Sequence, residues 1–166
     1  MIQKKICLMG AYAVGKTSLV ARYVHSIFSE KYQTTLGVKI DKKIVAAANG
    51  DVMLMIWDLA GEDEFIGADL EYTRGAAGYF LVADGTRRVS LERAVALQQR
   101  ICDRLGPVPF LLLVNKVDLE TEWEISTGDL EELSNAGWRI LRTSAKSGQG
   151  VEAAFLSLAT SVISSA

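Results

Sequence analysis

The segment from Gly10 to Thr17, GAYAVGKT, has residue types and a spacing that suit phosphate binding. It matches the pattern G-x-x-x-x-G-K-[ST], in which a glycine-bearing turn wraps its backbone N–H groups around a phosphate chain. A short apolar run precedes the turn and a helical pattern follows it, so the positive end of a helix would face the phosphate. The segment therefore predicts a phosphate site, and an ordinary strand-to-helix turn is the alternative.

A second segment places groups suited to a metal ion and a terminal phosphate after another apolar run. Asp58 ends the run that begins at Val52, and a carboxylate there can hold Mg²⁺ directly or through water. Gly61 has no side chain, so its N–H can approach a phosphate closely. A strand that ends in an Asp–Gly turn is the alternative interpretation.

Two later segments suit recognition of a guanine base. After the apolar run 110–114, the Asp118 carboxylate can accept two N–H donors from the Watson–Crick edge of guanine, an arrangement that adenine does not present. Asn115 would tie the loop together, and the Lys116 stem would cover the base. In residues 143–146, backbone N–H groups can meet the base oxygen, although this signal is weak alone. Charged turns at strand ends are the alternative.

Elements that position these segments alternate along the whole chain. The patterns predict strands over 2–9, 38–47, 52–58, 77–84, 109–114 and 138–143, and helices over 16–26, 63–74, 89–105, 126–136 and 150–163. Asn49-Gly50 predicts a tight antiparallel hairpin, whereas strands that are separated by helices should be parallel. The order indicates a doubly wound α/β domain that binds ligands at the carboxyl ends of its strands.

Composition narrows the class of protein. The chain has 166 residues, 49% of them hydrophobic, and we expect one domain over 1–166. Eighteen Lys and Arg residues against 20 Asp and Glu give a net charge of −2, which argues against a nucleic-acid-binding face. No run approaches the ~20 apolar residues of a membrane span. Cys7 and Cys102 lie in apolar stretches typical of reduced core residues. We expect a cytoplasmic monomer.

Together the four segments resemble the Ras-like small GTPases, in which such motifs follow one another in this order at successive strand ends. The similarity is closest to the Rab type in Tyr32–Val38 and Tyr72–Ala76, and it extends from Ile6 to about Ile163. The resemblance implies a P-loop NTPase G domain, with a six-stranded, mostly parallel sheet, one antiparallel strand and about five flanking helices. It also implies GTP and GDP as ligands, with Mg²⁺ as cofactor.

The resemblance assigns roles to residues. Lys16 would bridge the β- and γ-phosphates, and the backbone from Tyr12 to Ser18 would cradle them. Thr17 and Thr35 would place hydroxyls on Mg²⁺, and Asp58 would hold a metal-bound water. The implied nucleotide-binding set is Tyr12, Ala13, Val14, Gly15, Lys16, Thr17, Ser18, Phe28, Thr35, Asp58, Gly61, Asn115, Lys116, Asp118, Ser144, Ala145 and Lys146, and the catalytic set is Lys16, Thr35, Gly61 and Glu62.

Residues 29–38 and 60–74 would be two switch segments. Thr35 and Gly61 would contact the γ-phosphate and its metal only while GTP is present, so hydrolysis would release both segments from it. Effectors, an exchange factor and an activating protein would read this change, and Phe65, Leu70 and Tyr72 are candidates for the surface that they contact.

Other expectations concern the periphery. Phe28 would pack on the guanine face, with a core phenylalanine as the alternative. Trp123 and Trp138 are expected to pack peripherally, with partner contacts as the alternative. The last residues contain no cysteine for prenylation, and Ile2 follows Met1, so no lipid anchor is expected in this chain. Two explanations agree with this expectation: a chain shortened at its end, or a family member that works without a lipid anchor.

Glu62 departs from the family, most of whose members carry a glutamine that orients the attacking water. At neutral pH a carboxylate only accepts hydrogen bonds. At ~5 Å from γ-phosphate charge, the repulsion would be about 3 kcal/mol at an effective dielectric of ~20. We expect Glu62 to point outward in the GTP state, with an effect on rate of either sign.

Tyr12 and Ala13 replace glycines found in many members, and the change at Ala13 is mild. The Tyr12 ring would project beside the γ-phosphate, and our hypothesis is that it obstructs an arginine inserted by an activating protein; a ring that lies flat on solvent is the alternative. No arginine occurs between Ser26 and Ile40, so intrinsic hydrolysis should be slow. A pseudo-GTPase that does not turn over remains the alternative function, whereas an ATPase is disfavoured by residues 115–118.

Overall fold

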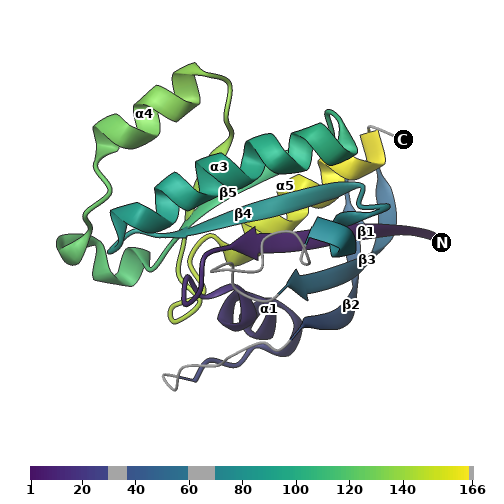
Figure 1. Ribbon diagram of the computed structural model, residues 1–166. Coiled ribbons are helices and arrows are strands. Elements are labelled where there is room, and N and C mark those ends of the chain that lie inside the picture. Colours follow the sequence, from purple (N-terminus) through teal and green to yellow (C-terminus); the bar gives the residue numbers. More distant parts are fainter. Residues whose placement is uncertain (30–36, 60–69, 165–166) are drawn as a thin grey trace.

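Six strands form one mostly parallel sheet in the computed structural model, which describes residues 1–29, 37–59 and 70–164 (Figure 1). The strand order is β2-β3-β1-β4-β5-β6, and β2 is antiparallel to β3 while every other neighbouring pair is parallel. This confirms the predicted fold class. The strands are β1 (Ile2–Gly10), β2 (Val38–Ala47), β3 (Gly50–Leu59), β4 (Gly78–Asp84), β5 (Phe110–Asn115) and β6 (Ile140–Thr143).

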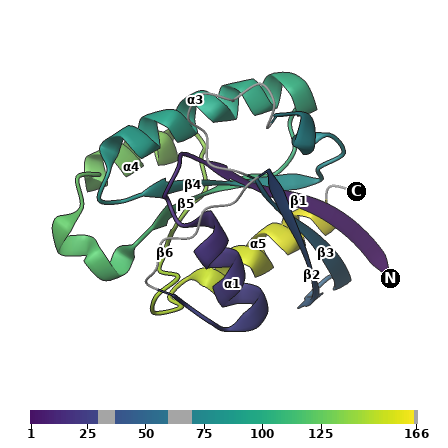
Figure 2. The ribbon, with the colours of Figure 1, turned by 60° about the horizontal axis from the view of Figure 1, so that its bottom comes forward.

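Helices cover both faces of the sheet. Figure 2 shows α1 and α5 on one face and α3 and α4 on the other. The α-helices are α1 (Lys16–His25), α3 (Arg88–Leu105), α4 (Thr127–Asn135) and α5 (Val151–Ser164), and the 3₁₀ helices are η1 (Glu71–Thr73) and η2 (Val117–Glu122). Within the described ranges, none of these helices is long and apolar enough to cross a membrane.

The core divides at the sheet because successive strand residues point to opposite faces. Ile6 and Leu8 pack with Phe155 of α5, whereas Cys7 and Met9 pack on the α3 side with Ile101. All of β4 is buried, as expected of a central strand covered by helices on both faces. Two layers of helix thus fix the positions of the strand ends.

The predicted hairpin forms one residue earlier than its sequence signal. Ala47 pairs with Gly50, so the turn consists of Ala48 and Asn49. Gly50 then opens β3 with a φ of 128°, a conformation that glycine adopts without steric cost. The side chain of Asn49 bonds to the end of α5, where its Nδ2 donates to Ser164 Oγ at 3.0 Å.

The helix expected over 63–74 lies largely outside the described residues. Within them, η1 is a 3₁₀ turn that ends before Arg74, and Gly75 follows with a φ of 79°. The pattern thus predicted a helix to residue 74, whereas the structure has a 3₁₀ turn over residues 71–73. The sequence analysis did not predict η2, because this short acidic segment has no apolar stripe of helical spacing.

Candidate functional site

Buried polar side chains gather at the carboxyl ends of the parallel strands. Asp58 near the end of β3, Asp84 at the end of β4, Asn115 at the end of β5 and Thr143 at the end of β6 are all at most 3% exposed. Asp84 pairs with Asn115 in the sheet, and Asn115 pairs with Thr143. Parallel strands bring these ends to one edge, where ligands of doubly wound folds bind.

The phosphate-loop candidates lie at this edge, between β1 and α1. Gly10 ends β1 so close to β4 that an added Cβ would be 2.4 Å from Val82 O. Ala13 and Gly15 adopt positive φ angles of 68° and 100°. Such a turn brings successive N–H groups to its concave side. Gly15 then caps α1 without a side-chain acceptor, and the first turn of α1 contains no acidic residue.

Lys16 is a buried cation within this turn. It is 6% exposed, and Nζ donates to Gly10 O at 3.1 Å and to Ala11 O at 3.2 Å. The ammonium group is thus held by the carbonyls of the loop itself. A buried cation favours an anion nearby, so this arrangement suits a phosphate.

Thr17 and Asp58 bring two oxygen donors together. Thr17 Oγ1 donates to Asp58 Oδ2 at 2.6 Å, although the residues are far apart in sequence. Hydroxyl and carboxylate oxygens are ligands that Mg²⁺ prefers, so the pair fits this ion. Among the described residues no group of three or more His, Cys, Asp and Glu side chains is placed to hold a metal.

The expected base-binding loop is fastened to the phosphate loop. Asn115 Nδ2 donates to Val14 O at 3.0 Å, and Asn115 Oδ1 accepts from Thr143 Oγ1 at 3.1 Å. Lys116 Nζ lies 3.4 Å from Ala13 O and 2.8 Å from Asp84 Oδ2. These contacts place the candidate base and phosphate segments side by side.

The Ser144–Lys146 segment meets the Asp118 carboxylate. Ser144 Oγ donates to Asp118 Oδ1 at 2.7 Å and accepts from Ser147 N at 3.0 Å. Asp118 is exposed, whereas Ser144 and Ala145 are buried. A buried hydroxyl therefore orients a carboxylate that faces solvent, which leaves that carboxylate accessible to a ligand.

The structure places the remaining candidates at the margin. Phe28 is partly buried and packs against the core beside α1. Tyr12 is 42% exposed, and Arg87 Nη1 donates to its carbonyl at 2.9 Å. Ser18 is half-buried in the first turn of α1, and Lys146 is exposed.

Thr35, Gly61, Glu62 and Phe65 lie outside the described residues. Leu70, a predicted partner contact, is only 3% exposed and belongs to the core, whereas Tyr72 is 36% exposed.

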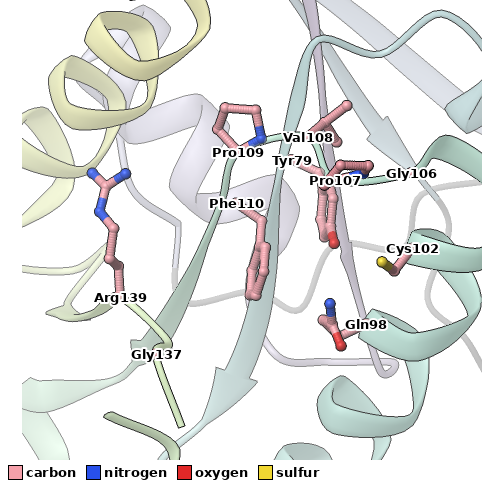
Figure 3. A pocket seen from close by; sticks show the side chains of 10 residues that line it. All are labelled: Tyr79, Gln98, Cys102, Gly106, Pro107, Val108, Pro109, Phe110, Gly137 and Arg139. Carbon is pink, nitrogen blue, oxygen red and sulfur yellow. The ribbon is translucent and has the colours of Figure 1, made fainter. Parts of the chain in front are cut away.

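A cavity of about 390 Å³ lies elsewhere, at the amino ends of β4 and β5. Figure 3 shows the rings of Tyr79 and Phe110 side by side, with Gln98 and Cys102 of α3 nearby. The two rings are stacked, with their centroids 5.2 Å apart. This cavity is at the opposite end of the strands from Lys16 and Asp118, so it is separate from the candidate site.

Several residues that shape the site were missed by sequence reasoning. Arg22 Nε donates to Ala145 O at 2.7 Å, and its Nη2 donates to Lys146 O. In sequence, Arg22 is an ordinary polar position of an amphipathic helix. Asp84 carried a usable signal, because it ends an apolar run just as Asp58 does. Trp123 packs at the edge of the core, as expected, and the sequence did not indicate that its Nε1 also donates to Lys116 O at 2.9 Å.

Comparison with known proteins agrees with this arrangement. A family model described as the Ras family matches residues 5–164. Ras-related protein Rab-13 of Bos taurus is 34% identical over 161 residues, which cover 96% of this chain and 79% of that protein. Rab-21 of Mus musculus is 35% identical over 164 residues, covering 98% and 74%. Rab-32 of Homo sapiens is 32% identical over 163 residues, covering 90% and 70%. The chain therefore belongs to the Ras family and is a small GTPase, an enzyme that hydrolyses GTP.

Proposed function

We propose that this protein is a guanine-nucleotide switch with slow intrinsic hydrolysis, and that the convergent strand ends form its nucleotide site. The observation that carries the proposal is the set of contacts that join the phosphate loop to the base loop, from Asn115 to Val14 and from Lys116 to Ala13. They bring a phosphate-binding turn and a base-binding loop to one edge of the sheet. A nucleoside triphosphate has both of the corresponding parts.

The phosphate end of the site consists of Lys16, Thr17, Asp58 and the N–H groups from residue 12 to residue 18. Lys16 holds negative charge at the β- and γ-phosphates, and the start of α1 supplies N–H donors and a partial positive charge. Thr17 and Asp58, whose oxygens lie together, would hold the Mg²⁺ ion. When bound, Mg²⁺ neutralises charge that develops on the phosphate oxygens.

The base end consists of Asp118, Lys116, Phe28 and the backbone of residues 144–146. The Asp118 carboxylate, oriented by Ser144, accepts the two N–H groups that guanine presents on one edge. Adenine presents no such pair, so the site favours GTP over ATP. The Lys116 stem and the Phe28 ring cover the two faces of the base.

Residues 29–38 and 60–74 are the switch segments of this proposal. Thr35 and Gly61 would contact the γ-phosphate and its metal, and these contacts would be lost after hydrolysis. Effectors, an exchange factor and an activating protein recognise the difference. The sequence between Ser26 and Ile40 supplies no arginine. Because an arginine supplied in trans accelerates turnover by roughly 10³- to 10⁵-fold in this class, intrinsic hydrolysis is slow.

Tyr12 limits how an activating protein works on this site. The exposed position of its side chain in the phosphate loop supports this part of the proposal. A ring that projects from this loop would stand in the approach of an arginine from outside. Tyr12→Gly should therefore raise hydrolysis stimulated by arginine-donating activators. Equal stimulation of Tyr12→Gly and wild type across a panel of activators would refute this role.

Single-turnover phosphate release from GTP-loaded protein tests the switch. We expect Mg²⁺-dependent hydrolysis that is slow without partners. Glu62→Gln measures what the carboxylate contributes, and an unchanged rate would show that position 62 is not catalytic here. Binding of GTP with no phosphate release, even with cell extract, would instead favour a pseudo-GTPase.

Asp118→Asn tests the base assignment. An asparagine at this position presents a donor as well as an acceptor, so we expect guanine nucleotides to bind more weakly and xanthine nucleotides to bind better. Competition of GTP, XTP and ATP against a fluorescent nucleotide measures the change. Asp51→Asn, on an exposed strand start, is the matched control and should leave the order of preference unaltered. Wild-type protein that binds ATP as well as GTP would contradict the assignment.

A further inference from the structure

Trp123 lies directly after η2, beside the loop that we assign to the base. Its Nε1 donates to Lys116 O at 2.9 Å, and the same carbonyl accepts from Leu119 N at 2.9 Å. The ring is half-buried and packs against the core on the α3 side. The peptide group that carries Lys116 is therefore held by two donors from η2 and its end.

Lys116 adopts a backbone conformation that needs such support. Its φ of 75° and ψ of 38° are in the left-handed region, which is sparsely populated by residues other than glycine. Conformations of this kind persist where surrounding contacts determine them. Trp123 holds the carbonyl, and Asp84, which is 1% exposed, holds the ammonium group at 2.8 Å. Backbone and side chain of Lys116 are thus fixed from two different elements.

The fold also makes room for the indole. Gly85 follows β4, and a Cβ added there would be 2.0 Å from Trp123 Cε2, so the ring lies directly on the glycine backbone. Gly85 O accepts from Glu124 N at 2.9 Å and from Ile125 N at 3.1 Å. On the ring, the Arg142 guanidinium is 5.7 Å from the centroid. The close packing on Gly85 and the backbone bonds of residues 124 and 125 hold the chain around the indole, whose Nε1 meets Lys116 O.

We propose that Trp123 is a positioning residue that fixes Lys116 against the phosphate loop and the nucleotide, and thereby lengthens the time for which guanine nucleotides stay bound. The inference rests on the proposed function, because Lys116 acts here through its contact with the base. Lys116 also reaches Ala13 O at 3.4 Å, so its displacement loosens the join between the two halves of the site.

Release of mant-GDP from the full chain, chased with excess GDP, tests this role. Trp123→Phe keeps an aromatic ring over Gly85 and removes the N–H, and we expect release to accelerate about three- to tenfold, the effect of one lost hydrogen bond. Trp138→Phe makes the same chemical change at an indole that packs on Phe110, and it should stay within about twofold of wild type. Asp84→Asn removes the charge that holds Lys116 Nζ and should accelerate release as well.

A double-mutant cycle separates positioning from general packing. Lys116→Gly removes the side chain and supplies a residue that adopts the left-handed region without strain. In that background Trp123→Phe should change the release rate by less than about twofold, because there is no side chain left to position. A full effect of Trp123→Phe in that background would show that the indole acts elsewhere and would overturn the inference.

The outcomes distinguish this inference from the proposed function. Wild-type protein that takes up no mant-GDP would refute the proposed function, and the inference with it. Normal uptake with an unchanged release rate in Trp123→Phe would refute the inference alone. Unfolding midpoints of all variants, measured with saturating GDP, show whether a faster release accompanies a loss of fold.

Discussion

At the scale of single residues, the site depends on close approaches that admit no extra atoms. A Cβ at Gly10 would lie 2.4 Å from Val82 O, one at Gly15 would lie 2.4 Å from Asn115 Nδ2, and one at Gly85 would lie 2.0 Å from Trp123 Cε2. Each glycine thus allows a neighbour that belongs to a different part of the site to come into contact. Gly15 in addition needs a φ of 100°.

Gly85→Ala tests such a contact without touching the proposed ligand. The new methyl group would overlap the indole of Trp123, so the ring or the end of β4 must move, and we expect the free energy of unfolding to fall by about 1–3 kcal/mol. Urea denaturation measures this.

Gly128→Ala is the matched control for Gly85→Ala. Its added Cβ would meet its nearest neighbour, Ser126 Oγ, at an ordinary 3.6 Å. Because alanine favours a helix more than glycine does, this control should gain up to about 1 kcal/mol. Equal stability of Gly85→Ala and wild type would contradict the close packing of Trp123.

At the scale of elements, the N-terminal N–H groups of α4 and α1 obtain hydrogen-bond partners in different ways. The first N–H groups of a helix lack partners within the helix. In α4 the need is met internally, since Ser126 Oγ accepts from Asp129 N at 3.1 Å and Asp129 Oδ2 accepts from Ser126 N at 2.8 Å. In α1 the cap is Gly15, which offers no side-chain acceptor, and the start of the helix faces the candidate phosphate site.

Ser126→Ala should destabilise the protein by about 1 kcal/mol, because it removes the acceptor of the capping box. Thermal unfolding measures the shift, and Ser134→Ala on the exposed part of α4 is the control, expected to stay within about 0.5 kcal/mol of wild type.

The same cap gives a pH dependence. The Ser126 backbone N–H lowers the pKa of Asp129, so the contribution of the pair is present above the ordinary aspartate pKa and is lost as pH falls through the lowered value. The difference between wild type and Asp129→Ala, which removes the carboxylate that accepts this bond, should therefore shrink in acid. A difference that stays constant to low pH would argue against the reciprocal bond.

At the scale of the whole molecule, a core formed on both faces of one sheet buries several weak acids. Burial raises the pKa of Cys7 to about 12, and burial likewise raises those of Tyr23 and Tyr79 to about 12. Cys7 lies in β1, Tyr23 in α1 and Tyr79 in β4, so the three groups report on both layers of the core. None of them belongs to the proposed nucleotide site.

Stability should fall in alkali for this reason. A group whose pKa is raised on folding stabilises the native state fully below its unfolded pKa, and the contribution is lost as pH rises through the folded value. Urea denaturation between pH 8 and 11 should therefore give a free energy of unfolding that declines above about pH 9.

Cys7→Ala isolates one of the three contributions to this slope. We expect it to make the decline shallower, by up to about 1.4 kcal/mol per pH unit. Identical slopes in wild type and Cys7→Ala would contradict the assignment.

Much of the fold could be predicted because its signals are local. Alternating apolar runs and helical stripes gave the six strands, their parallel or antiparallel sense and the helices α1, α3, α4 and α5. The motif at Gly10–Thr17 and the triad Asn115, Lys116 and Asp118 gave the candidate site, because a short chain segment contains all the groups that each motif needs. Turn positions and 3₁₀ segments were less predictable, since they depend on single backbone angles rather than on periodicity.

The sequence by itself determined which segments end at the ligand edge, because the pattern of apolar runs specifies where each strand stops. Only the tertiary structure decided which side chains support them. Arg22 reaches Ala145 from 123 positions away, and Asp84 and Trp123 hold Lys116 from two different elements. The physical reason is the strand order, which sets β4 beside β1 and β5 and so makes neighbours of loops that no local pattern connects.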